Sequence, residues 1–325
     1  MISKEKIYDR LMGCLYGQAI GDALGLGAEG QYADGMARMY PNKLQRYDEI
    51  IPFAHVRRWR PAEYTDDTDQ MLCILNSLIS DDCINPVTIA KNILYWFEND
   101  GMGCGALTYK IINAPGWLDN PIAISKIGWE LTNKHSAPNG GLMRTSVVGL
   151  WNKDVIKNAE MACMVTHYDP RCVGSCVIAS MIINNLVWHN REMSYDEIIE
   201  IANSYDSRIA EWVTLAKDSN DIRALELDEE KSMGYTLRTL AAALWCYWHS
   251  NDFTLGLIDV VNEGGDADTN AAIACAILGA KYGFSNIPSH YIDNMYKTNE
   301  YRNICEQFSN LCLNKFIITN NPSKA

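Results

Sequence analysis

The sequence predicts an all-α protein built as a single domain. Apolar residues recur at helical spacing along almost the whole chain. No segment shows the period-two alternation of a half-buried strand, and no Pro-, Ser- or Gly-rich linker divides the 325 residues. With 48% hydrophobic and 21% charged residues, the chain can bury a sizeable core. We expect about a dozen helices over residues 1–318 and a frayed tail at 319–325.

Each expected helix has a start signal or a repeating apolar face. Ser3 caps the first, whose buried face is Ile7, Leu11 and Leu15. Three more begin where proline takes the first helical position, at Asn85-Pro86 through Phe97, Asn120-Pro121 through Leu131, and Asp169-Pro170 through His189. Ser194 and Glu197 form a capping box before another. The same spacing predicts helices over 206–217, 235–249, 253–262, 267–282 and 298–315. Residues 31–63 are irregular, and we expect a surface loop with short helices there.

Charge and cysteine usage narrow the function classes. The net charge is −12 and the pI is near 5.0. An acidic chain without a basic stripe argues against direct nucleic-acid binding. Residues 1–10 contain no signal-peptide core, and no apolar run reaches the roughly 20 residues of a membrane span. The eleven cysteines include no Cys-x-x-Cys pair. We therefore expect a cytoplasmic protein without a zinc site or a membrane partner.

A short acidic stretch opens one of the apolar runs. Residues 65–69 read Thr-Asp-Asp-Thr-Asp and precede the run that begins at Met71, so Thr65 or Asp66 is the expected N-cap. A single acid here would be a charged cap that uses the helix dipole. Three acids so close together repel one another, and a hard divalent cation would relieve that repulsion. The stretch fits either a cap or a metal site.

A second stretch of the same kind lies about 200 residues later. In residues 263–270, Glu-Gly-Gly-Asp-Ala-Asp-Thr-Asn, two glycines allow a tight turn before a helix of small residues. Asp266, Asp268 and Thr269 would then present their oxygens together. Brought together, the two stretches would supply about six oxygens, enough to bridge two divalent cations. The alternative is two unrelated caps, which the repeated composition disfavours.

The N-terminal helix carries glycine at every fourth position, at Gly13, Gly17, Gly21 and Gly25. This spacing forms a bare ridge that another helix or a ligand can approach closely. Tight helix packing is the simpler explanation for the first two glycines. Asp22 and Glu29 flank the end of the ridge, and each is either a surface acid or a member of the metal clusters.

Two polar stretches complete the set. Residues 136–141, Ser-Ala-Pro-Asn-Gly-Gly, offer backbone N–H groups that can hold an anion. They lead into Leu142-Met143-Arg144, which we interpret as the start of a helix. Thr166-His167-Tyr168-Asp169-Pro170 closes one helix and opens the next, and His167 there is either a cap or a functional residue.

Taken together, these motifs resemble the ADP-ribosylglycohydrolase family. Five places carry the resemblance, in the family's order over about residues 13–283. They are Gly21-Asp22-Ala23-Leu24-Gly25 with Glu29, Thr65-Asp66-Asp67-Thr68, Asn139-Gly140-Gly141-Leu142-Met143-Arg144, Thr166-His167-Tyr168-Asp169-Pro170, and Gly264-Gly265-Asp266-Ala267-Asp268-Thr269.

The resemblance implies an orthogonal all-α bundle with two divalent cations, Mg²⁺ or Mn²⁺, in a cleft. It implies hydrolysis of the glycosidic bond between ADP-ribose and a modified side chain, with ADP-ribose as product. The implied metal ligands are Thr65, Asp66, Asp67, Asp266, Asp268 and Thr269. Glu29 is the implied acid/base, and Asp66 competes for that role. The implied substrate contacts are Gly101, Gly103, Gly105, Ser136, Asn139, Gly140, Gly141, Met143 and His167.

The acceptor is the part of the substrate on which the motifs disagree. The segment Gly101-Met102-Gly103-Cys104-Gly105 resembles serine-specific members, whereas Thr166 to Arg171 resembles the bacterial and fungal branch. Pro138 replaces a glycine common in the family and removes one N–H donor. We expect the acceptor residue to be arginine, slightly ahead of serine. The alternative substrate is a small ADP-ribose conjugate such as an O-acetyl ester.

Other classes fit less well. An all-α prenyl-diphosphate or terpene synthase needs Asp-Asp-x-x-Asp, and the last position here is Gln70. A haloacid-dehalogenase-type phosphatase needs Asp-x-Asp-x-Thr after a strand, whereas Thr269 directly follows Asp268. A non-catalytic structural relative of the same fold would have lost metal ligands, and this chain retains all six candidates.

Overall fold

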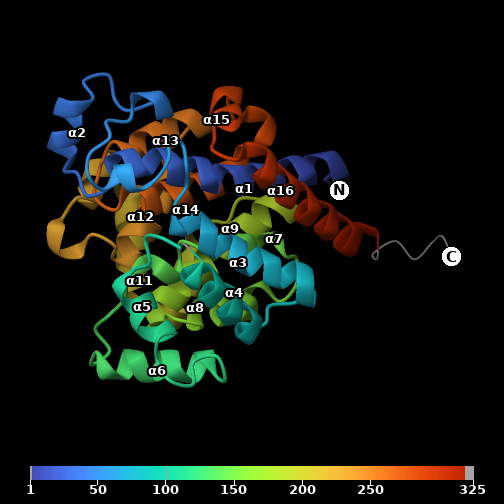
Figure 1. Cartoon of the computed structure of the whole chain (residues 1–325). Helices are drawn as coiled ribbons and strands as arrows, with labels where there is room; N and C mark the ends of the chain where they lie inside the picture. The colour runs from blue at the N-terminus through green and yellow to red at the C-terminus, as the bar shows by residue number, and fades with distance from the viewer. Residues whose placement is uncertain (1, 100, 319–325) are drawn as a thin grey trace.

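The computed structural model describes residues 2–99 and 101–318, and the tail predicted at 319–325 lies outside them. The described residues form helices joined by turns, with only two isolated β-bridges, Tyr32 to Gly264 and Pro138 to Tyr235. Figure 1 shows the arrangement. The all-α class is confirmed, and the single-domain organisation stays a prediction.

Helix boundaries follow the expected start signals closely. Ser3, Asn85, Asn120, Asp169 and Ser194 are N-caps, and the side chain of each accepts a backbone N–H. The helices are α1 (Lys4–Gly25), α2 (Ala33–Met39), α3 (Asp66–Asp81), α4 (Pro86–Glu98), α5 (Ala106–Ile112), α6 (Pro121–Leu131), α7 (Ser146–Leu150), α8 (Val155–Met164), α9 (Pro170–His189), α10 (Tyr195–Tyr205), α11 (Ser207–Asp218), α12 (Thr236–His249), α13 (Phe253–Val261), α14 (Ala267–Tyr282), α15 (Ser289–Asp293) and α16 (Thr298–Leu313).

The predicted helix start at Leu142 is wrong. Residues 139–141 form a single 3-10 turn, residues 142–144 continue as turns, and α7 begins only at Ser146. Gln18 of α1 reaches across the fold to this stretch, where its Nε2 donates to Met143 O (2.9 Å), while Thr145 Oγ1 donates locally to Gly141 O (2.5 Å). Tertiary contacts therefore override the local helical pattern here.

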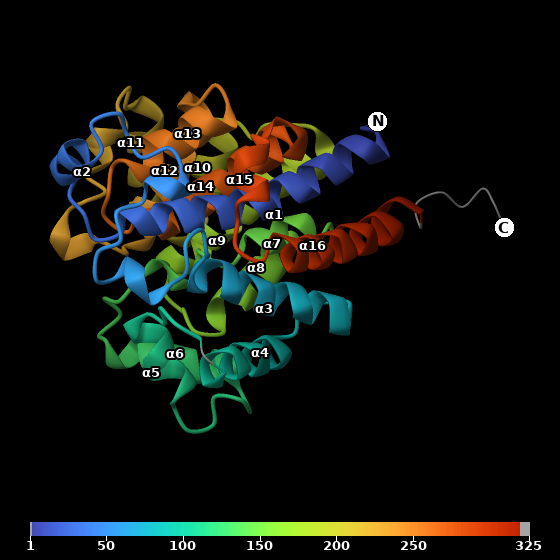
Figure 2. The same ribbon diagram turned by 45° about the horizontal axis from the view of Figure 1, so that its top comes forward.

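Helices α1 and α14 run antiparallel through the middle of the molecule (Figures 1 and 2). All four ridge glycines face α14, because an added Cβ would clash with a backbone carbonyl there. The pairs are Gly13 with Gly279, Gly17 with Cys275, Gly21 with Ala271, and Gly25 with Ala267. Glycine costs about 1 kcal/mol relative to alanine in a helix, and the close backbone approach offsets this cost. The ridge is a packing surface, and it places the end of α1 beside the start of α14.

Helix α9 packs against α7, α8, α10, α12 and α14. It is long and apolar enough to span a membrane by length and composition alone, contrary to our expectation that no run would reach that length. Most of α9 is buried inside the molecule, as in the core helix of a globular protein.

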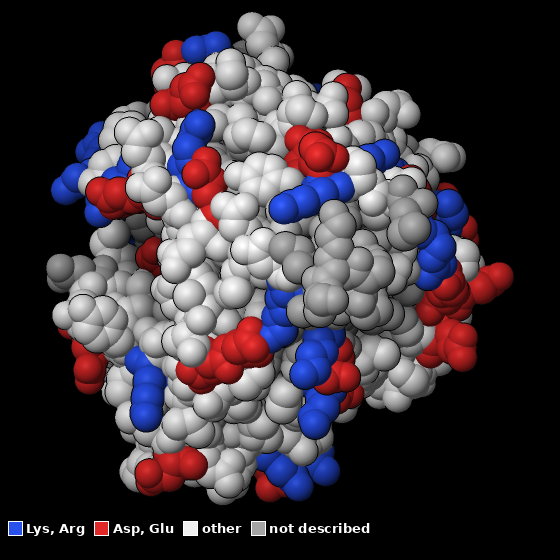
Figure 3. All heavy atoms as spheres, turned by 90° about the vertical axis from the view of Figure 1, so that its right-hand side faces the viewer, with Lys and Arg blue, Asp and Glu red and all other residues white. Residues whose placement is uncertain are grey.

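Acidic and basic side chains are intermixed on the face drawn in Figure 3. The expectation that the chain does not bind nucleic acid stays a prediction.

Candidate metal centre and active site

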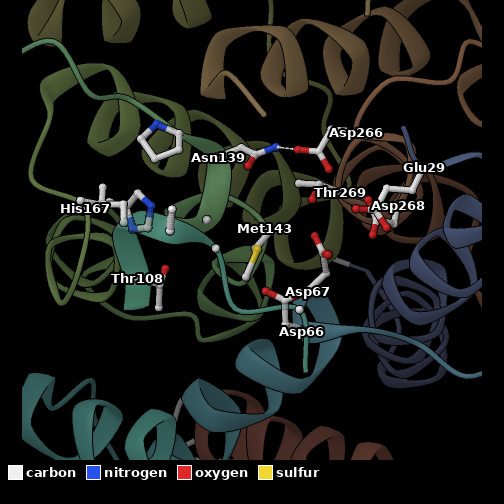
Figure 4. Close-up of a pocket in the computed structure, with 16 residues that line it drawn as sticks. Glu29, Asp66, Asp67, Thr108, Asn139, Met143, His167, Asp266, Asp268 and Thr269 are labelled. Atoms are coloured by element: carbon white, nitrogen blue, oxygen red, sulfur yellow. Dashed lines mark hydrogen bonds between the residues drawn. The ribbon is translucent and has the colours of Figure 1, made fainter. Parts of the chain in front are cut away.

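Three chain segments that are distant in sequence meet at one place. The segment after α1 brings Glu29, the start of α3 brings Thr65 to Asp67, and the start of α14 brings Asp266 to Thr269. Figure 4 shows these acids on one side of a pocket, with His167 on the other. The two acidic stretches are therefore brought together, as predicted.

Asp22 holds the start of α3 in place from α1. Its carboxylate accepts hydrogen bonds from the backbone N–H of Thr65 (2.9 Å) and from the N–H and hydroxyl of Thr68 (3.0 and 2.6 Å). Thr65 occupies the expected N-cap position, but its side chain makes no capping bond and instead donates to Asp67 Oδ2 (3.0 Å). The cap of α3 thus comes from another helix, and it fixes α3 relative to α1.

The carboxylates form two overlapping groups. Single oxygens of Asp22, Asp67 and Asp268 lie within 4.8 Å of one another, and so do those of Glu29, Asp266 and Asp268. Asp268 belongs to both groups and joins them into one cluster. Asp66 lies beside this cluster and lines the cavities on both sides of it.

The turn before α14 depends on its two glycines. Gly264 and Gly265 have φ values of 70° and 68°, and an added Cβ would clash with the carbonyls of Gln31 and Leu227. Gly265 N donates to Gln31 O (2.8 Å), and Gly30 N donates to Gly265 O (2.7 Å). These bonds tie the turn to the segment that carries Glu29 and keep Glu29 near Asp266.

Electrostatics favour a cation in this cluster. Burial, followed by the neighbouring carboxylates, raises the pKa of Asp66, Asp67 and Asp268 well above the ordinary value. The buried Oδ1 of Asp67 has no hydrogen-bond partner in the described part of the chain. Carboxylate and hydroxyl oxygens are the ligands that Mg²⁺ and Mn²⁺ take. The donor set therefore fits a hard divalent cation.

A cavity of about 220 Å³ extends from the acids to His167. It is lined by most of the predicted substrate contacts, namely Gly103, Gly105, Asn139, Gly140, Met143 and His167. Gly103 has φ +91°, and a Cβ there would clash with the Asp66 carboxylate. Ser136 and Gly141 are not among the lining residues, and Gly141 instead backs onto Cys163 and His167. Thr108, which the sequence did not single out, also lines this cavity.

The loop at Asn139 is less open than expected. Its backbone N–H donates to Gly234 O (2.8 Å), so it is not free to hold an anion. The side-chain Nδ2 donates to Asp266 Oδ2 (2.8 Å) and to Thr239 Oγ1 (2.9 Å). Asn139 therefore supports a predicted metal ligand directly.

A second cavity of about 340 Å³ lies on the other side of Glu29 and Asp66. Gly101 lines it, together with residues that sequence reasoning missed: His55, Arg58, Trp59, Phe97 and Tyr109. His55 Nε2 contacts Glu29 Oε2 as an ion pair when the imidazole is protonated. Burial raises the pKa of Glu29, and His55 opposes that shift. His55, Arg58 and Trp59 come from the irregular segment 31–63, where no periodic pattern marks them.

Comparisons with known proteins show the family of the chain. The family model described as ADP-ribosylglycohydrolase matches residues 3–316. The ADP-ribosylarginine hydrolase Tri1 of Serratia proteamaculans is 26% identical, over 94% of this chain and 81% of its own length. The ADP-ribosyl-[dinitrogen reductase] glycohydrolase of Rhodospirillum rubrum is 24% identical, over 89% of this chain and 91% of its own length.

A solved structure gives the same fold. The structure described as an ADP-ribosylglycohydrolase-related protein complex aligns with a TM-score of 0.73 at 23% identity, covering 95% of this chain and 99% of that chain. Because the family model covers nearly the whole described chain, the protein belongs to the ADP-ribosylglycohydrolase family and is a hydrolase of that family.

Proposed function

We propose that the protein hydrolyses the glycosidic bond between ADP-ribose and a protein side chain, with arginine as the preferred acceptor. One observation carries the proposal: two cavities meet at a buried acidic cluster and share Glu29, Asp66, Gly103 and Asp268 in their walls. A bond at this junction would have one substrate group in each cavity. The Serratia relative is named an ADP-ribosylarginine hydrolase, and this supports arginine as the acceptor.

We propose that ADP-ribose occupies the cavity that ends at His167. Its distal ribose would lie at the acids, and its diphosphate would lie toward Gly140 and His167. The acceptor side chain would leave through the second cavity, past Trp59 and Tyr109. Aromatic walls beside carboxylates suit a planar guanidinium, because rings and acids both attract it.

Two divalent cations, Mg²⁺ or Mn²⁺, are proposed as the cofactor. Thr65, Asp66, Asp67, Asp266, Asp268 and Thr269 would hold them, and three of these, Asp67, Asp266 and Asp268, lie in the two carboxylate groups. Asp22 is better assigned to positioning, because its oxygens already accept three hydrogen bonds from α3. When bound, such cations orient vicinal hydroxyls and lower the pKa of a bound water.

The protein's own groups would handle the proton and the developing charge. Glu29 stands at the junction of the cavities and is the proposed acid/base: a carboxylate oxygen would take the proton of the attacking water and give it to the acceptor atom as the bond from that atom to the anomeric carbon breaks. His55, in contact with Glu29, would hold that carboxylate in place. The remaining carboxylates stabilise the oxocarbenium-like charge at the anomeric carbon.

A cytoplasmic location is also proposed, and the eleven free cysteines support it.

The test is release of ADP-ribose from arginine-linked, serine-linked and O-acetyl-linked substrates, after chelation and after adding back Mg²⁺ or Mn²⁺. The proposal expects metal-dependent release, fastest from the arginine-linked substrate. The matched control is Asp34→Asn, a change at a carboxylate that is 81% exposed and outside the cluster, which should retain full activity. Faster release from the serine or ester linkage would correct the acceptor. No release from any of the three substrates would overturn the proposed activity.

A further inference from the structure

Arg144 is a buried cation with no acidic partner among the described residues. Its side chain is fully buried, and no carboxylate in the described part of the chain forms an ion pair with it. It donates from Nη1 to Gln70 Oε1 (2.9 Å) and from Nη2 to Thr166 Oγ1 (2.6 Å). A buried charge is costly unless it is well bonded, so a guanidinium held by neutral groups suggests a role in orienting those groups.

The bonds continue in both directions to the walls of the cavity. On one side, Gln70 Nε2 donates to Asp66 Oδ2 (3.2 Å). On the other side, Thr166 Oγ1 lies 2.7 Å from Nδ1 of His167. One hydrogen-bonded chain therefore links a predicted metal ligand to the histidine at the far end of the cavity.

The proton positions in this chain follow from the chemistry of its members. Arg144 can only donate, so Thr166 Oγ1 accepts from it and has its own proton left to give. The neighbouring acceptor is Nδ1 of His167, and a buried hydroxyl without an acceptor would be costly. Thr166 is itself buried, so solvent does not compete for that proton. With Nδ1 accepting, the proton of a neutral imidazole resides on Nε2.

The Nε2 edge of His167 faces the cavity. A Cβ added to Gly140, which lines the cavity, would lie 3.0 Å from Cε1 and 3.1 Å from Nε2. Nε2 has no hydrogen-bond partner among the described residues. Burial, and then the charge of Arg144, lower the pKa of His167 well below its ordinary value, which agrees with a neutral ring. Figure 4 shows the ring across the pocket from the acids.

We propose that Arg144 and Thr166 are positioning residues that lock His167 as the neutral Nε2–H tautomer, so that its N–H donates to an anionic group of the ligand in the cavity. The identity of that group as the diphosphate of ADP-ribose rests on the proposed function. The tautomer itself does not, because it follows from the bonds of Arg144 and Thr166 alone.

The tautomer can be read directly by two-bond ¹H–¹⁵N correlation of the six histidines, with His167 assigned from a His167→Gln sample. The wild-type protein at pH 7 should show His167 protonated on Nε2 only. Thr166→Val keeps the shape but removes the hydroxyl, and should abolish this single-tautomer pattern. Thr166→Ser restores a hydroxyl and should restore the pattern.

Binding of ADP-ribose in the presence of Mg²⁺ gives the second readout. Loss of an oriented donor to a charged group should raise Kd about tenfold or more in Thr166→Val and leave the Thr166→Ser value close to wild type. Thr236→Val is the matched control, because Thr236 is a buried threonine whose hydroxyl has no partner in the described chain. It should change neither the tautomer nor Kd.

The outcomes separate the two claims. A wild-type ring protonated on Nδ1, or a Thr166→Val protein with an unchanged tautomer, would overturn the positioning assignment. If the tautomers are as expected but the wild-type protein does not bind ADP-ribose, the positioning assignment is supported and the proposed ligand is refuted. An unchanged tautomer would still count against the proposal even if Kd rose, since Thr166 would then act in another way.

Discussion

The two walls of the main cavity are built on opposite principles. The wall formed by the ends of α1, α3 and α14 gathers carboxylates, and no buried basic side chain among the described residues pairs with them. Behind the opposite wall lies a buried guanidinium, Arg144, whose hydrogen bonds go to the neutral groups of Gln70 and Thr166. The acidic wall suits cations, and the neutral wall would present the proposed Nε2–H of His167, which suits an anion. A ligand with hydroxyls at one end and a diphosphate at the other matches both walls.

The largest expected effect comes from breaking the acidic wall at its shared residue. Asp268→Asn removes the one carboxylate common to both groups. Loss of a catalytic cation removes several kcal/mol of transition-state stabilisation, so activity should fall more than ~1,000-fold. Calorimetry with Mn²⁺ should show weaker or missing metal binding, while Asp34→Asn binds normally. Wild-type activity in Asp268→Asn would show that the cluster is not the catalytic centre.

Glu29→Gln tests the acid/base separately from the metal. Removing a general acid or base typically costs ~10²–10⁴ in rate, and Gln keeps the size of the side chain. Turnover should fall within that range while Mn²⁺ affinity stays near wild type. Full activity would refute the role of Glu29, and a parallel loss of metal affinity would make Glu29 a ligand.

The position of the acidic wall depends on the contact between α1 and α14. Gly21→Ala places a methyl group against the backbone of Ala271, and overpacking of this kind costs about 1–3 kcal/mol. Gly35→Ala is the control, because nothing lies within 4 Å of an added Cβ on α2. Chemical denaturation should show a lower free energy of unfolding for Gly21→Ala only. Equal stability of both variants would contradict the packing account.

Stability of the metal-free protein should fall as pH rises. Asp66, Asp67 and Asp268 have raised pKa values in the folded state, so the folded chain holds more protons than the unfolded chain above about pH 4. Each carboxylate therefore contributes stability at low pH that is lost as pH rises through its folded pKa. After chelation, Tm should be lower at pH 8 than at pH 6, and Mn²⁺ should raise Tm most at pH 8. A Tm that rises with pH after chelation would contradict these shifts.

The smallest expected effect concerns the second cavity. His55→Gln removes the contact to Glu29 but leaves the main cavity unchanged. Removing a group that only supports a functional side chain typically costs at least about 10-fold in activity. We therefore expect kcat to fall by about 10-fold, while the Kd for ADP-ribose stays unchanged. A changed Kd would place His55 on the ADP-ribose side of the junction.

The same contrast between the walls shows what the sequence can reveal. The acidic wall was predictable, because both acidic stretches lie at helix starts and their composition is unusual on its own. Asp22 was noted near the ridge, but its capping of α3 depends on how two helices pack. His55 and Trp59 lie in an irregular segment without periodicity, so no pattern pointed to them.

The neutral wall was harder to predict for a physical reason. Arg144 looked like part of a helix start, yet the carbonyl of its neighbour Met143 accepts a hydrogen bond from Gln18 of α1, across the fold. The family resemblance placed Ser136 and Gly141 at the cavity, but they are not among its lining residues. Whether a residue lines the cavity depends on the direction in which it points and on its hydrogen bonds. Neither follows from the spacing of residues along the chain.

Anomalous diffraction from crystals grown with Mn²⁺ and ADP-ribose tests the central claim most directly. The account predicts two manganese peaks, one on each side of Asp268, with the distal ribose against them and the diphosphate within hydrogen-bond distance of His167 Nε2. Manganese absent from the acidic cluster, or a diphosphate on the side of Trp59, would contradict it.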